Sequence, residues 1–104
     1  MNKYYVYILK CSDNSYYTGV TNNLEKRIVE HNSGHNSQSY TFKRRPVELV
    51  YYEVFQNIND SIAFEKQIKG WSRRKKEAVI SNEWHKLPDL SRNRSSTQSS
   101  DEVD

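Results

Sequence analysis

Residues 4–20 read YYVYILKCSDNSYYTGV, and this stretch decides the fold. Aromatic and β-branched side chains fill residues 4–10 and again residues 16–20, a composition that is typical of β-strands. Between them, Ser12-Asp13-Asn14-Ser15 supplies the short polar side chains that bond local backbone in turns. The stretch therefore predicts a β-hairpin, and its register is left open.

Cap residues and helical spacing predict the elements that follow the hairpin. Asn22 with Glu25 three residues later forms a capping-box-like pair, and Asn59-Asp60-Ser61 supplies a second helix start. The predicted elements are a helix over 23–31 ended by Gly34, a mobile loop or short helix over 32–45, a strand over 47–55, a helix over 61–69 and a third helix after Ser72. This order indicates an α/β protein of the α+β type.

Length and charge favour one basic domain followed by a tail. The chain has 104 residues and a net charge of +3. Residues 88–104 hold two arginines against four acidic residues, so residues 1–87 carry +5, which fits attraction to nucleic acid. We expect 1–87 to form the domain and 88–104, which is Ser-rich and acidic, to be disordered.

Other sequence features favour a cytoplasmic protein. Cys11 is the single cysteine, so an internal disulfide is impossible. No apolar stretch approaches the roughly 20 residues of a membrane-spanning helix, and the N-terminal residues do not form a signal peptide.

Five features in a fixed order carry the chemistry. Tyr5-Val6-Tyr7 and Tyr17-Thr18-Gly19 lie on the two hairpin strands, Arg27 and His31 share a face of the first helix, and Glu65 lies on the second helix. In this order the chain resembles the GIY-YIG nuclease superfamily, in particular its small stand-alone bacterial members.

The resemblance covers residues 3–82 and implies both a fold and a reaction. It implies a three-stranded, mainly antiparallel sheet flanked by helices, and an endonuclease that hydrolyses DNA phosphodiester bonds with one Mg²⁺ or Mn²⁺, in repair or recombination. Glu65 would be the protein ligand of the metal. Tyr7 and Tyr17 would flank the attacking water, one of them serving as general base with a pKa lowered by Arg27 or the metal.

By the same resemblance, Arg27 would grip the phosphate, and His31 would hydrogen-bond a tyrosine or share proton transfer. The family's downstream asparagine has two possible counterparts, Glu77 and Asn82. The resemblance does not choose between them.

A nucleic-acid-binding module without catalysis, or an adaptor that uses the acidic tail, remains an alternative. Two basic segments could contact a polyanion, with Tyr40 and Phe42 available to stack on bases, although a solvated surface is the simpler explanation of such charges. The candidate nucleic-acid-binding residues are Lys43, Arg44, Arg45, Arg73, Arg74, Lys75 and Lys76. A protein partner could supply specificity, and the structure of the nucleic acid, DNA or RNA, stays open.

Overall fold

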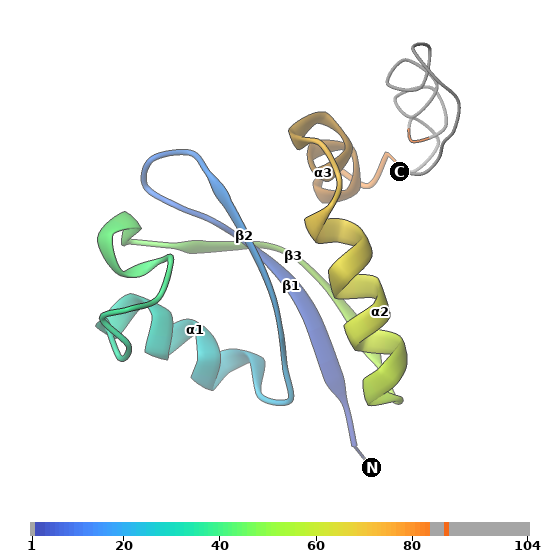
Figure 1. The fold of residues 1–104 in the computed structure, drawn as a ribbon, viewed down its shortest axis with the longest axis horizontal. Helices are drawn as coiled ribbons and strands as arrows, with labels where there is room; N and C mark the ends of the chain where they lie inside the picture. The colour runs from blue at the N-terminus through green and yellow to red at the C-terminus, as the bar shows by residue number, and fades with distance from the viewer. Residues whose placement is uncertain (1, 84–86, 88–104) are drawn as a thin grey trace. The chain divides into compact units, whose positions relative to one another are not determined.

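The computed structural model describes residues 2–83 and 87, so the tail predicted over 88–104 lies outside the described residues. The elements are β1 (Tyr4–Lys10), β2 (Tyr16–Thr21), α1 (Leu24–Ser33), the 3₁₀ helix η1 (Phe42–Arg44), β3 (Glu48–Phe55), α2 (Ile58–Lys69) and α3 (Arg73–Ile80). The chain divides into two compact units, and the boundary follows Glu65 within α2. The first unit holds the sheet, α1, η1 and the start of α2 (Figure 1).

The three strands form one antiparallel sheet in the order β2-β1-β3. Tyr7 on the central strand lies opposite Gly19 of β2 and Tyr52 of β3. Because β1 is paired on both sides, residues 6–9 are fully buried. The predicted hairpin and the predicted α+β class are therefore confirmed.

The helix α1 packs on the sheet face that carries Tyr7 and Leu9. These two residues form a buried cluster with Cys11 and Val47, against which Leu24 and Ile28 of α1 pack, as their helical spacing predicts. The end of α1 is fastened by Asn32, which accepts from the backbone N–H of Val47 (2.7 Å) and donates to its carbonyl (3.1 Å). The helix that carries the candidate site residues is thus held at both ends.

Two helices begin at other residues than predicted: α1 begins one residue later, and α2 begins three residues earlier. Asn23, not Asn22, caps α1, its side-chain oxygen accepting from the N–H of Lys26 at 3.1 Å. The helix α2 begins at Ile58, because the side chain of Asn57 accepts from two N–H groups of its first turn. The predicted end of α1 is confirmed, since Gly34 adopts φ 74° in the left-handed region.

The second unit contains the end of α2 and the whole of α3. Ser72 caps α3 by accepting from the N–H of Lys75 at 3.2 Å, as predicted. The side chain of Lys75 is 2% exposed and its Nζ lies 5.2 Å from the centre of the Trp71 ring. Lys75 therefore differs from the three other cations of this segment, which keep the partial or full exposure expected of a basic surface.

In the described part of the chain, every helix is too short or too polar to cross a membrane.

Candidate active site

Tyr7 lies at the centre of the candidate site. Its side chain is fully buried, and its ring passes directly over Gly19 of the paired strand. A Cβ atom added at Gly19 would lie 2.5 Å from the Tyr7 hydroxyl oxygen, far inside van der Waals contact. Glycine is therefore needed at position 19 to leave room for the phenol, not to permit an unusual backbone conformation.

Replacing Gly19 by alanine is expected to displace the Tyr7 ring and destabilise the protein by about 1–3 kcal/mol, the usual cost of overpacking a core. Thermal unfolding should show it as a midpoint lowered by about 4–8 °C per kcal/mol. Gly70→Ala is the matched control, because a Cβ there meets nothing closer than 3.6 Å. Equal melting of the Gly19→Ala and Gly70→Ala variants would contradict the packing of Tyr7 on Gly19.

The hydroxyl of Tyr7 interacts with two residues of α1. It lies 3.1 Å from Nε2 of His31, and the positive charge of Arg27 acts on it and lowers its pKa. Tyr17 completes the group, its ring centre lying 5.1 Å from that of His31 and 6.3 Å from that of Tyr7. The structure thus brings together the four residues that the sequence proposed as catalytic.

Burial controls the protonation of Tyr7. Burial raises the pKa of this phenol well above its usual value, the Tyr17 and Glu65 charges raise it further, and Arg27 lowers it. The expected effect of Arg27 is present, but it is smaller than that of burial. Tyr7 is therefore a neutral phenol at pH 7 and acts as a base only where another group takes its proton.

His31 is the group placed to take that proton. Burial lowers the pKa of His31, Arg27 lowers it further, and Glu30 opposes both. Since the ordinary value is already below 7, the imidazole is neutral at pH 7. A neutral imidazole has one nitrogen free to accept.

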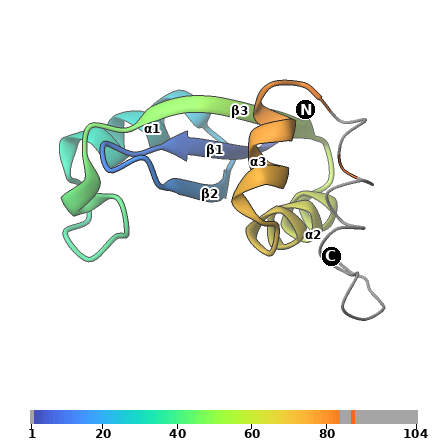
Figure 2. The same cartoon turned by 90° about the horizontal axis from the view of Figure 1, so that it is seen from above.

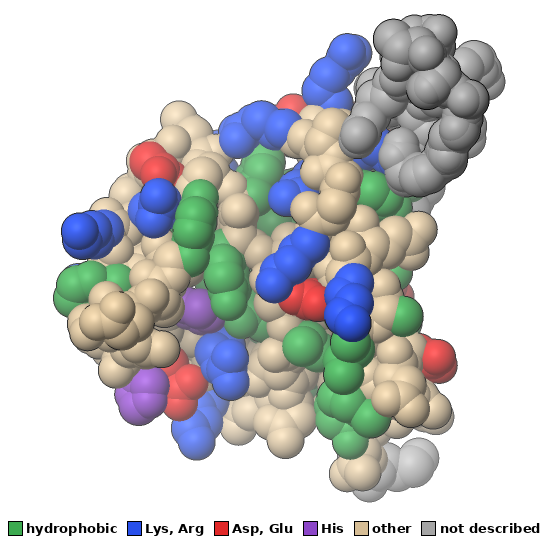
Figure 3. Space-filling view, viewed as in Figure 1, with side chains coloured by type: hydrophobic (Ala, Val, Ile, Leu, Met, Phe, Trp, Pro, Cys, Tyr) green, Lys and Arg blue, Asp and Glu red, His purple; other side chains and the backbone are tan. Residues whose placement is uncertain are grey.

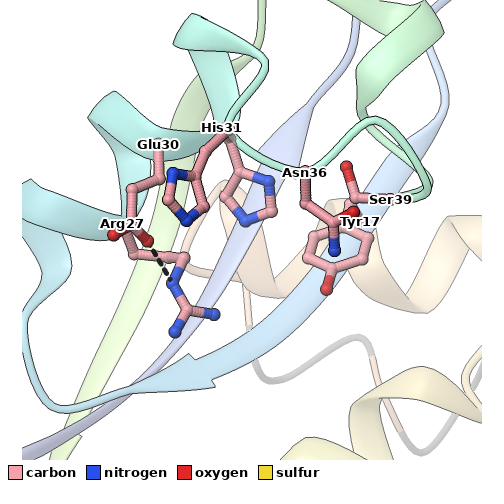
Figure 4. A pocket seen from close by; sticks show the side chains of 7 residues that line it. Tyr17, Arg27, Glu30, His31, Asn36 and Ser39 are labelled. Carbon is pink, nitrogen blue, oxygen red and sulfur yellow. Dashed lines mark ion pairs between the residues drawn. The ribbon is translucent and has the colours of Figure 1, made fainter.

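An open pocket of about 390 Å³ gives access to this group. It is lined by Tyr17, Arg27, Glu30, His31, His35, Asn36 and Ser39. Figure 4 shows Arg27, Glu30 and His31 side by side on α1, with the Nε of Arg27 3.2 Å from Oε1 of Glu30. In the space-filling view, basic, acidic and imidazole side chains gather beside a column of hydrophobic ones (Figure 3). The guanidinium of Arg27 in this pocket can therefore bind an anion, and Glu30 competes with that anion for the guanidinium.

Glu65 is the candidate metal ligand, and it fits a site with one carboxylate. It is half-buried on α2 and close enough to Tyr7 for its charge to act on the phenol. Within residues 2–83 and 87, no three His, Cys, Asp or Glu side chains group together as a metal cage. Magnesium does not require such a cage, because it keeps several waters and takes phosphate oxygens beside one or two carboxylates.

The segment after α1 is fastened to the hairpin turn. The guanidinium of Arg44 stacks on Tyr40 at 3.9 Å, donates to the Tyr40 carbonyl (2.8 Å) and pairs with Asp13 (3.1 Å). In addition, the N–H of Ser12 donates to the Arg44 carbonyl, which places η1 beside the turn (Figure 2). Within the segment predicted as a mobile loop or short helix, residues 42–44 form the short helix η1.

Three arginines of the two candidate segments have intramolecular partners. Arg45 stacks on Phe42 at 4.4 Å and donates to its carbonyl, and Arg73 pairs with Glu77 at 3.0 Å. Arg44 and Arg45 thus stabilise the conformation of the segment around η1. The role of the basic segments toward nucleic acid stays a prediction.

Comparison with known proteins agrees with this geometry. A family model described as the GIY-YIG catalytic domain matches residues 3–78. The chain belongs to the GIY-YIG family. It is 48% identical over 81 residues to a UPF0213 protein of Staphylococcus saprophyticus (78% of this chain, 98% of the relative) and 53% identical over 78 residues to one of Clostridium perfringens (75% and 83%).

Two solution structures share the fold of this GIY-YIG protein. The UPF0213 protein BH0048 of Bacillus halodurans is 37% identical with a TM-score of 0.52, covering 86% of this chain and 95% of its own. The protein EF2693 of E. faecalis is 34% identical with a TM-score of 0.56, covering 79% and 86%. Membership places the chain in a nuclease family, with nucleic acid as the class of substrate.

Sequence reasoning missed three residues of the site. Glu30 pairs with Arg27, Thr41 contacts His31, and Ser39 contacts Thr41. The i, i+3 spacing of Arg27 and Glu30 was a usable signal. Nothing in the local sequence marks Thr41 or Ser39.

Proposed function

We propose that this GIY-YIG protein is a cytoplasmic, metal-dependent endonuclease that hydrolyses phosphodiester bonds of DNA. The observation that carries the proposal is the hydrogen-bonded pair of Tyr7 and His31 beside an open pocket that Arg27 lines, with the charges of Arg27 and Glu65 acting on the Tyr7 phenol. It combines a proton acceptor, a phosphate-binding cation and a carboxylate for Mg²⁺ or Mn²⁺.

The side chains divide the work as follows. Arg27 donates to the scissile phosphate, since its planar fork matches two phosphate oxygens. Tyr7 accepts a proton from the attacking water while its own proton passes to Nε2 of His31. The resulting hydroxide forms the new P–O bond as the bond to the leaving oxygen breaks. Tyr17 orients the water. A divalent metal on Glu65 would supply a Lewis acid for the leaving oxygen.

Substituting the two members of the Arg27–Glu30 ion pair should change the interaction with DNA in opposite directions. Arg27→Ala should lower cleavage about 10- to 100-fold, because hydrogen bonds to charged groups contribute about 1.5–3 kcal/mol. Glu30→Gln removes the competitor for the guanidinium and should tighten DNA binding. The measurements are plasmid and branched-DNA cleavage in Mg²⁺ and DNA binding in EDTA, with circular dichroism as the folding control.

The outcomes separate the two function classes. Equal cleavage by wild type and Arg27→Ala would make Arg27 a surface charge and contradict its role. Salt-dependent binding by every variant, without any metal-dependent product from the wild type, would favour the non-catalytic binding module instead.

A further inference from the structure

Thr41 extends the hydrogen bonds of the site toward the pocket. Its side chain is fully buried, and its Oγ1 lies 2.7 Å from Nδ1 of His31. On its other side, the same Oγ1 lies 3.2 Å from Oγ of Ser39, which lines the pocket. A continuous path of polar atoms therefore runs from the buried Tyr7 hydroxyl to the pocket wall.

The donors along this path can be assigned from Arg27. The positive charge of Arg27 acts on the Tyr7 hydroxyl, which favours the phenol oxygen facing the guanidinium and the phenol proton facing Nε2 of His31. Nε2 then accepts, and the neutral imidazole carries its proton on Nδ1. That proton points to Oγ1 of Thr41, whose own proton is directed to Ser39.

The loop holds Thr41 in this position. The N–H of Arg44 donates to the Thr41 carbonyl (3.0 Å), and the N–H of Phe42 donates to the Ser39 carbonyl (3.2 Å). The stacking of Arg44 on Tyr40 fixes the same turn from outside. These bonds hold the hydroxyl of Thr41 against His31 and the hydroxyl of Ser39 against Thr41.

We propose that Thr41 and Ser39 complete a proton relay from Tyr7 through His31 to the pocket, with Thr41 as the positioning residue that keeps the His31 proton on Nδ1. One proton moves at each step: from Tyr7 to Nε2, from Nδ1 to Thr41, from Thr41 to Ser39, and from Ser39 to water. The net result is a phenolate oxygen at Tyr7 and one proton in the pocket. Its part in catalysis rests on the proposed function, whereas the tautomer of His31 does not.

The titratable and charged groups around His31 are consistent with a neutral starting imidazole. Tyr7 and Tyr17 face it from the sheet, and Arg27 and Glu30 flank it on α1. Burial and Arg27 together outweigh the opposing charge of Glu30, so the pKa of His31 is lowered.

The decisive experiment is ¹⁵N NMR of the His31 ring in the full chain at pH 7.5, without metal or DNA. Wild type should show the proton on Nδ1, Thr41→Val should lose this preference, and Thr41→Ser should restore it. His31→Gln assigns the signal against the two other histidines. A wild-type ring protonated on Nε2, or an unchanged tautomer in folded Thr41→Val, would overturn the proposal.

Ser39→Ala keeps the test independent of how well Thr41→Val folds. It should leave the His31 tautomer unchanged and lower cleavage, because it removes only the last carrier. Thr41→Val should lower cleavage about 10- to 100-fold, the usual effect of losing a group that orients a histidine, with Thr41→Ser near wild type. An Nδ1 tautomer in a wild type that cuts no DNA would contradict the proposed function and leave the positioning role of Thr41 intact. Full activity in both Ser39→Ala and Thr41→Val would remove the relay.

Discussion

Replacing Glu65 by glutamine is expected to abolish divalent-metal binding and to lower cleavage by at least about 10³-fold. Magnesium favours charged oxygen ligands, and the amide has nearly the shape of the carboxylate without its charge. A metal that stabilises phosphate and leaving-group charge contributes several kcal/mol, of which each 1.4 kcal/mol is tenfold in rate. Because Glu65 is half-buried at the surface of α2, the fold should survive the change.

Manganese-induced line broadening gives a readout that does not depend on finding the substrate. Signals of Tyr7 and Tyr17 should broaden in wild type on titration with Mn²⁺, and they should stay sharp in Glu65→Gln. Glu53→Gln is the matched control, because it removes the same charge from an exposed residue of β3. Identical broadening in wild type and Glu65→Gln would remove Glu65 as the metal ligand.

Local signals predicted most of the scaffold. The strand Tyr4–Lys10 is observed with the predicted bounds, because its composition and the turn that follows both act over a few residues. Arg27 and His31 were correctly placed on one face because four residues make about one helical turn. The start of α2 was predicted too late because two residues could cap it. Asn57 is the residue that caps the helix. Ser61 lies inside the helix, where its hydroxyl donates to the Ile58 carbonyl.

Features set by distant pairing could not be predicted. The register that places Tyr7 opposite Gly19 depends on the whole sheet, so the need for a glycine there emerges only in three dimensions. The bond between His31 and Thr41 joins residues ten apart across a loop whose path is set by Arg44. The lowering of a tyrosine pKa by Arg27 was expected, but the larger effect of burial depends on how completely β1 is covered.

Replacing Tyr7 by phenylalanine is expected to lower cleavage about 10²- to 10⁴-fold, the range for removing a general base. The ring that fills the core is kept, so the protein should fold. Losing the hydroxyl leaves Nε2 of His31 without this partner, at a cost of about 1–3 kcal/mol in unfolding free energy. Cleavage and chemical denaturation of the same preparations measure both effects.

Tyr17→Phe is the control that decides which tyrosine is the base. Tyr17 keeps its ring contacts with His31 and with Tyr40, which stacks on it at 6.0 Å, so its loss of a hydroxyl should cost less activity. The larger loss in Tyr17→Phe would instead assign the base to Tyr17. If Tyr7 and His31 act as one unit, the double variant Tyr7→Phe/His31→Gln should be little worse than either single variant, since a chain broken once carries no proton. Multiplicative losses in the double variant would mean that His31 acts independently of Tyr7.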